Sequence, residues 1–110
     1  MQTIIETPTF IDSAKKLLSS EQVEEIKSLL AADPKAGAVM AGTGGFRKIR
    51  IAREGGGKSG GFRIIYFLYN ESIPVFLFTV YAKNAQENLT KAQRNTLAKI
   101  AEAYQAYGKE

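Results

Sequence analysis

The side chains that could do chemistry in this sequence gather in one glycine-rich stretch, residues 42–70 (GTGGFRKIRIAREGGGKSGGFRIIYFLYN). Its basic residues are Arg47, Lys48, Arg50, Arg53, Lys58 and Arg63, and a single acid, Glu54, opposes them. Arginine and lysine bind phosphate, and arginine does so through paired hydrogen bonds. The stretch therefore indicates an anion-binding surface, although Lys and Arg also occur on solvated strands, where they protect sheet edges.

The segment GGGKS at residues 55–59 does not satisfy the rule for a nucleotide-binding phosphate loop. A Walker A motif needs a glycine five positions before Gly57 and a helix after the Lys-Ser pair. Ala52 stands at the first place, and a strand-like run follows the second. We interpret the segment as a hairpin connection, in which Lys58 contacts a nucleic-acid backbone.

The composition restricts the chemistry further. The 110 residues suggest one domain, 1–110, with a net charge of +4 and neither histidine nor cysteine. The commonest general base, disulfides and thiolate metal sites are therefore excluded, so acid–base chemistry must use Asp, Glu, Lys or Tyr. No metal-ligand spacing is visible, and we expect neither a metal nor a small-molecule cofactor. No apolar run approaches a membrane span and no signal peptide is evident, so we expect a cytoplasmic protein without a membrane partner.

The elements that must position the basic residues follow from hydrophobic periodicity. Residues 2–6 read as a short strand. The first helix is predicted to start at Pro8, with Thr7 as its cap, and to end at about Leu18. The second runs from Ser19 or Ser20 to the ADP sequence at 32–34, and the third covers residues 90–106. Strands are predicted over 46–53, 62–69 and 75–83, and residues 35–45 read as a connector. The order β-α-α-β-β-β-α predicts an α+β fold: a helical hairpin on one face of a largely antiparallel sheet, and a C-terminal helix.

Alternation along the strands sorts their side chains into two faces. The apolar set predicted to lie beneath the helical hairpin is Ile49, Ile51, Ile64, Leu68, Phe76, Phe78 and Val80. The opposite face is predicted to carry Lys48, Arg50, Arg63, Tyr81 and Lys83, together with Ile65, Phe67, Val75 and Leu77. This registration assumes that no bulge interrupts the strands.

Three segments in this order, GTGGFRKIRIA, GGKSGGFRIIYFLY and VYAKNAQENLT, resemble the RelE/ParE toxin superfamily, and its RelE-like, HigB-type branch most closely. The resemblance spans nearly the whole chain. It implies a toxin of a type II toxin–antitoxin system, which acts as a ribosome-dependent endoribonuclease, cuts translated mRNA in the ribosomal A site and is neutralised by a cognate antitoxin protein. The implied partners are therefore the antitoxin, the ribosome and mRNA.

The resemblance implies catalytic or RNA-binding roles for the residues that the alternation had placed on one face: Lys48, Arg50, Arg63, Tyr81 and Lys83. We expect Arg63 to stabilise the transition state while the 2′-OH attacks the adjacent phosphorus, and Lys48 and Arg50 to hold the backbone. Tyr81 or Lys83 is expected to orient the scissile nucleotide or to act as acid or base. Arg47, Arg53 and Lys58 are predicted to contact the RNA.

Three other functions remain open from the sequence. A ParE-like toxin shares the fold and acts on DNA gyrase without cutting RNA, and a non-enzymatic module would bind nucleic acid in a salt-sensitive way. An interaction protein with an inert basic face is a further alternative. The cluster of Arg63, Tyr81 and Lys83 favours the ribonuclease.

Overall fold

The structure is a computed structural model that describes residues 2–52, 61–82 and 89–107. Its elements are β1 (Ile4–Glu6), α1 (Pro8–Leu17), α2 (Ser20–Ala32), β2 (Ala38–Val39), β3 (Phe46–Ile51), β4 (Phe62–Phe67), β5 (Val75–Ala82) and α3 (Lys91–Gln105). The predicted helices agree with these elements to within a few residues. The same holds for the strands predicted over residues 2–6, 46–53, 62–69 and 75–83. The two-residue strand β2 lies inside the predicted connector, where glycines obscure the alternation of a strand this short.

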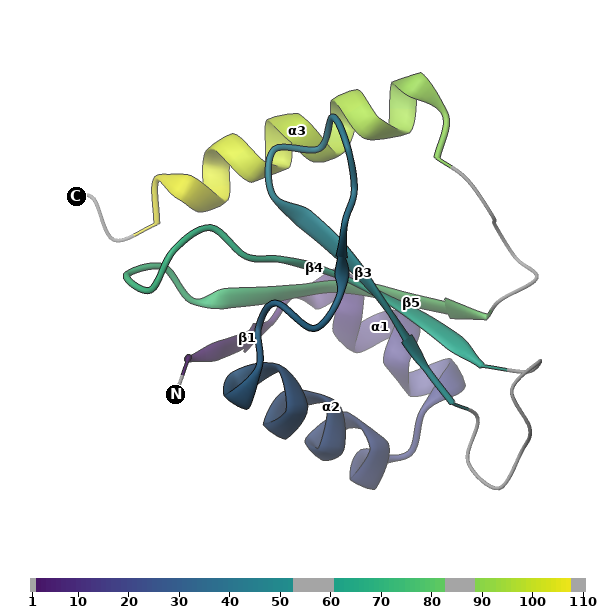
Figure 1. The fold of residues 1–110 in the computed structure, drawn as a ribbon. Coiled ribbons are helices and arrows are strands. Elements are labelled where there is room, and N and C mark those ends of the chain that lie inside the picture. The colour runs from purple at the N-terminus through teal and green to yellow at the C-terminus, as the bar shows by residue number, and fades with distance from the viewer. Residues whose placement is uncertain (1, 53–60, 83–88, 108–110) are drawn as a thin grey trace.

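The elements form three layers, with α1 and α2 on one face of the sheet and α3 across the other (Figure 1). The strand order is β1-β5-β4-β3-β2, so β4 is the central strand. All neighbouring pairs are antiparallel except β1 and β5, which are parallel. The predicted α+β class is confirmed, and α3 covers the apolar side chains of the second face.

Local capping chemistry explains where the three helices begin. Thr7 accepts a hydrogen bond from the backbone N–H of Phe10 and is followed by Pro8, a residue preset for the first helical position. Ser19 and Thr90 each form a reciprocal capping box with the glutamine three residues later. Because these signals are local, the sequence alone predicts the starts of the helices.

The side chains of the sheet form one core on each face. The core beneath α1 and α2 includes Phe10, Ile26, Leu30, Ile64, Tyr66, Val75, Leu77 and Val80, with Ile49, Ile51 and Leu68 packed against it. The core beneath α3 includes Phe46, Ile65, Phe67, Phe76, Leu97 and Ala101, with Phe78, Tyr81 and Tyr104 at its border.

Four face assignments made from the sequence are wrong: Phe76 and Phe78 lie on the α3 face, and Val75 and Leu77 on the helical-hairpin face. The cause is a bulge in β5. Ile65 pairs with Thr79 but Tyr66 pairs with Leu77, so Phe78 is an extra residue. One extra residue reverses the alternation of everything before it on that strand. Residues after the bulge, Tyr81 among them, keep the predicted face.

The turn between β2 and β3 needs glycine because α3 packs against it. Gly44 has φ +77°, a left-handed conformation that other residues adopt only with strain. A Cβ atom at Gly44 would also lie 3.0 Å from the Cβ of Ala101 on α3. The first glycine-rich segment of the sequence is thus a close contact between a turn and a helix.

A buried tyrosine connects the segment between α2 and β2 to the sheet. The hydroxyl of Tyr66 donates to the carbonyl of Pro34 at 2.7 Å and accepts from the N–H of Gly37 at 2.8 Å. Arg47 donates to the carbonyls of Gly37 at 2.8 Å and Lys35 at 3.3 Å. These bonds hold the segment between α2 and β2 against the hairpin face of the sheet.

We expect Tyr66→Phe to lower the free energy of unfolding by about 1–3 kcal/mol, since it leaves two backbone groups of this segment without their partner. Urea denaturation measures the change. The matched control is Tyr69→Phe, because Tyr69 is 49% exposed. Equal midpoints for the two variants would show that the Tyr66 hydroxyl does not stabilise the fold.

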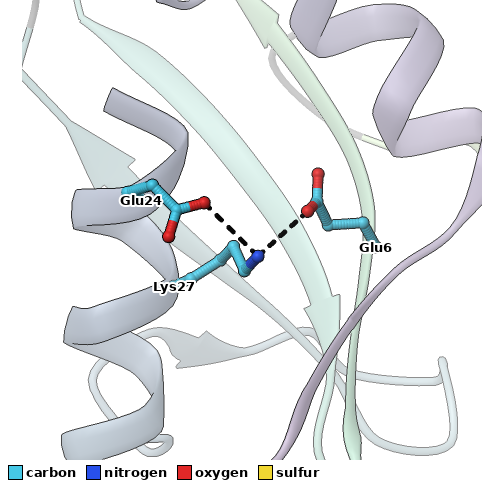
Figure 2. Close-up of polar contacts among 3 residues, drawn as sticks. All are labelled: Glu6, Glu24 and Lys27. Carbon is cyan, nitrogen blue, oxygen red and sulfur yellow. Dashed lines mark hydrogen bonds and ion pairs between the residues drawn. The ribbon is translucent and has the colours of Figure 1, made fainter. Parts of the chain in front are cut away.

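A basic residue on α2 belongs to the scaffold and lies apart from the basic strands. Lys27 donates to Glu6 of β1 at 3.1 Å and to Glu24 at 3.4 Å (Figure 2). The hydrogen bond that Lys27 donates to Glu6 raises the pKa of Lys27. Since all three groups are partly exposed, the cluster contributes at most about 1 kcal/mol, and its main effect is to tie α2 to β1.

None of the helices in the described part of the chain has the length and apolarity to cross a bilayer.

Candidate nucleic-acid interface

The face of the sheet beneath α3 is organised in three rows that run across the strands. The aromatic row is Phe46, Phe67 and Phe76, the middle row is Lys48, Ile65 and Thr79, and the cationic row is Arg50, Arg63 and Tyr81. Within each row the residues are direct partners on β3, β4 and β5. The pairing therefore brings side chains from three strands together in the cationic row.

Arg63 is the centre of the cationic row and occupies an unusual position for an arginine. It lies on β4, the central strand, and its Nη1 atom is buried without a hydrogen-bond partner among the described residues. A buried unsatisfied donor costs about 1–3 kcal/mol, and more when it is charged. Protection of a sheet edge cannot explain a charge on a central strand. The guanidinium is therefore better explained as a group that binds an anion.

Tyr81 pairs with Arg63 across the strands and lies within its electrostatic reach. Burial raises the pKa of the Tyr81 phenol, and the nearby positive charge of Arg63 offsets only part of this. The phenol therefore stays protonated at neutral pH, as an unperturbed tyrosine does, and can donate a hydrogen bond or a proton.

Arg50 and Lys48 place further positive charge beside Arg63. Arg50 is exposed and directly opposite Arg63, and Lys48 is half-buried one row away. Like charges that face each other across two strands repel. No carboxylate among the described residues forms an ion pair with any of these three cations. The cluster therefore attracts anions from outside the protein.

The structure brings together four of the eight site residues predicted from the sequence: Lys48, Arg50, Arg63 and Tyr81. It does not bring Arg47 to them, because Arg47 pairs with Tyr66 and lies on the opposite face, where it binds backbone carbonyls. These hydrogen bonds tie Arg47 to the segment between α2 and β2, and its contact with RNA stays a prediction. Arg53, Lys58 and Lys83 lie outside the described residues.

A pocket of about 310 Å³ lies next to these residues and had no counterpart in the sequence analysis. It is lined by Ile65, Phe78, Thr79, Leu89, Ala92, Gln93, Thr96 and Leu97. The helical periodicity of residues 90–106 indicated core positions but gave no sign that one half of the helix would leave a space.

Within the described ranges, no three His, Cys, Asp or Glu side chains are grouped so that they could hold a metal ion.

Comparisons with known proteins agree with this architecture. Residues 7–110 match the model of the family described as the RelE toxin of the RelE/RelB toxin–antitoxin system. Among solved structures, the fold is similar to that of an arginine double mutant of the E. coli toxin RelE in the free state, with a TM-score of 0.58 and 22% sequence identity. That match covers 78% of this chain and 87% of the E. coli chain. The chain therefore belongs to the RelE family of toxins from toxin–antitoxin systems.

Proposed function

We propose that this toxin is a ribosome-dependent endoribonuclease that cleaves translated mRNA in the A site and so inhibits translation. The observation that carries the proposal is the buried, unpartnered Nη1 of Arg63 in a row with Arg50 and Tyr81. Such a group matches the non-bridging oxygens of a phosphodiester, which accept paired hydrogen bonds from a guanidinium. The family membership supports the same reading, as do the RNA-cleaving roles that the resemblance implies.

The proposed reaction needs no histidine and no metal-ligand set. The 2′-OH gives up its proton to Lys83 or to water and attacks the adjacent phosphorus, and the bond from phosphorus to the 5′-oxygen breaks. The products are a 2′,3′-cyclic phosphate, or the 3′-phosphate that water forms from it, and a 5′-OH. Arg63 stabilises the charge that develops on the phosphoryl oxygens, while Arg50 and Lys48 hold the flanking backbone. The ribosome supplies much of the orientation for in-line attack. Lys83 remains a predicted acid or base.

Tyr81 is proposed to protonate the leaving 5′-oxygen, since its phenol is neutral and faces Arg63. We expect Tyr81→Phe to lower the single-turnover cleavage rate by about 10²-fold or more, because general acid catalysis contributes about that much. The phenylalanine ring would retain any stacking on a base. A Tyr81→Phe enzyme that cleaves at the wild-type rate would assign Tyr81 to stacking alone.

The direct test of the function is to map mRNA 5′ ends after the toxin is added to a reconstituted translation reaction. Cuts within codons on translated mRNA, with a 5′-OH on the downstream fragment, are expected. The same mRNA without ribosomes should remain intact. Uncut mRNA together with loss of supercoiling by DNA gyrase would instead identify a gyrase inhibitor, and salt-sensitive RNA binding without cuts would identify a binding module.

The antitoxin is the partner that the toxin–antitoxin family implies. Ribosome and mRNA as partners, the cytoplasmic location, the HigB-type branch and the single domain 1–110 remain predictions. Co-expression with the cognate antitoxin should suppress both toxicity and the mapped cuts.

A further inference from the structure

The pocket beside the cationic row arises because the two halves of α3 contact the sheet differently. Near its C-terminus, Tyr104 stacks on Phe76 with ring centroids 4.1 Å apart, and Ala101 is fully buried. Nearer its N-terminus, Ala92, Thr96 and their neighbours line the open pocket of about 310 Å³. The space therefore lies over the middle row of the sheet, at the end of α3 away from the aromatic row.

The pocket floor and Arg63 are two residues apart along the strands. Ile65 on the pocket floor follows Arg63 by two residues, and Thr79 precedes Tyr81 by two. Two residues along an antiparallel strand span roughly 6.8 Å. This is comparable with the reach from a phosphate to the base within one nucleotide. A nucleotide whose phosphate binds Arg63 can therefore place its base in the pocket.

We infer that this pocket is a nucleobase subsite that takes the base of a nucleotide next to the scissile phosphate. The inference rests on the proposed ribonuclease function. Apolar side chains such as Ile65, Phe78 and Leu97 would contact the faces of the base. The Thr96 hydroxyl donates to the carbonyl of Ala92 at 3.0 Å, and its oxygen can still accept a hydrogen bond from the edge of a base.

Charge favours a nucleotide over an apolar side chain of a protein as the occupant. The unpartnered Nη1 of Arg63 and the cations Arg50 and Lys48 lie beside the pocket. A nucleotide brings a phosphate for these cations together with a flat ring for the apolar walls, a pairing used by many single-strand binding sites. An apolar side chain would fill the pocket and leave the guanidinium without a partner.

The first test is a titration of the wild-type protein with AMP or CMP, followed by the methyl NMR signals of Ile65, Leu89 and Leu97. Ribose 5-phosphate, which lacks a base, is the control. We expect the nucleotides to shift these methyl signals and ribose 5-phosphate to leave them in place. If N-acetyl-leucine amide shifts them and neither nucleotide does, the pocket is a site for a protein partner and the inference is wrong.

The second test fills the pocket from the helix. Ala92→Phe places a ring at the pocket, and Ala103→Phe makes the same change at an exposed position of α3 outside it. On translating ribosomes we expect Ala92→Phe to lower kcat/KM at least tenfold and to alter which nucleotides flank the cuts. Ala103→Phe should match the wild type, and thermal melts check that both variants fold.

The outcomes separate the two proposals. Unchanged rate and cut pattern in a folded Ala92→Phe protein would overturn the subsite and leave the ribonuclease standing. No cleavage by the wild type would reject the ribonuclease. The nucleotide titration would then show by itself whether the pocket binds a nucleobase. The titration also decides the case if Ala92→Phe does not fold.

Discussion

Replacing Arg63 with alanine is expected to lower the rate of mRNA cleavage on ribosomes by about 10²–10³-fold, the usual effect of removing one group that stabilises a developing charge. The protein should stay folded, because the Nη1 atom has no partner among the described residues that the substitution would break. Single-turnover cleavage of a ribosome-bound mRNA measures the rate, and toxicity in cells should disappear in parallel.

Two further substitutions at Arg63 separate its chemistry from its packing. Arg63→Met keeps the aliphatic stem and removes the buried unsatisfied donor, so its free energy of unfolding should equal or exceed that of the wild type. Arg63→Lys keeps the charge but not the paired geometry, so it should recover only part of the rate. An Arg63→Met protein that cleaves normally and unfolds more easily would show that Arg63 is a structural residue.

The largest expected loss of stability comes from Phe46→Ala, at about 3–5 kcal/mol. Phe46 is fully buried on β3 at the centre of the core beneath α3. Its ring centroid lies 5.4 Å from that of Phe67, 5.6 Å from Phe78 and 6.1 Å from Tyr104. A domain of this size is stable by about 5–15 kcal/mol, so the variant should unfold at a much lower urea concentration.

Tyr69→Ala is the matched control for Phe46→Ala. Tyr69 also contacts Phe67, with stacked rings 6.3 Å apart, but it is 49% exposed. We expect its loss to change the free energy of unfolding by no more than about 1 kcal/mol. Similar urea midpoints for the two variants would mean that α3 is not held by the aromatic row.

The fold was largely predictable wherever the signals are local. The helix starts are predicted by cap residues whose side chains bind backbone groups within three residues, namely Thr7 (followed by Pro8), Ser19 and Thr90. The β2 strand and the parallel pairing of β1 with β5 were not predictable in this way, because both depend on partners elsewhere in the chain.

The candidate site was predictable to the extent that strand alternation is undisturbed. Lys48, Arg50 and Arg63 share a face on regular strands, and Tyr81 joins them because it follows the bulge in β5. Phe76 and Leu77 precede the bulge, so their faces were predicted in reverse. Arg47 shows a second limit, since only the folded connector reveals the carbonyls of Lys35 and Gly37 that it binds.

The sequence by itself determined the helices, their caps, the concentration of positive charge and the absence of histidine and cysteine. Tertiary structure alone decided that Arg63 lies on the central strand with a buried Nη1, that Tyr81 pairs with it across the strands, and that a pocket opens beside them. The reason is physical: propensity and capping act over a few residues, whereas burial, strand order and register arise from contacts between segments far apart in the chain.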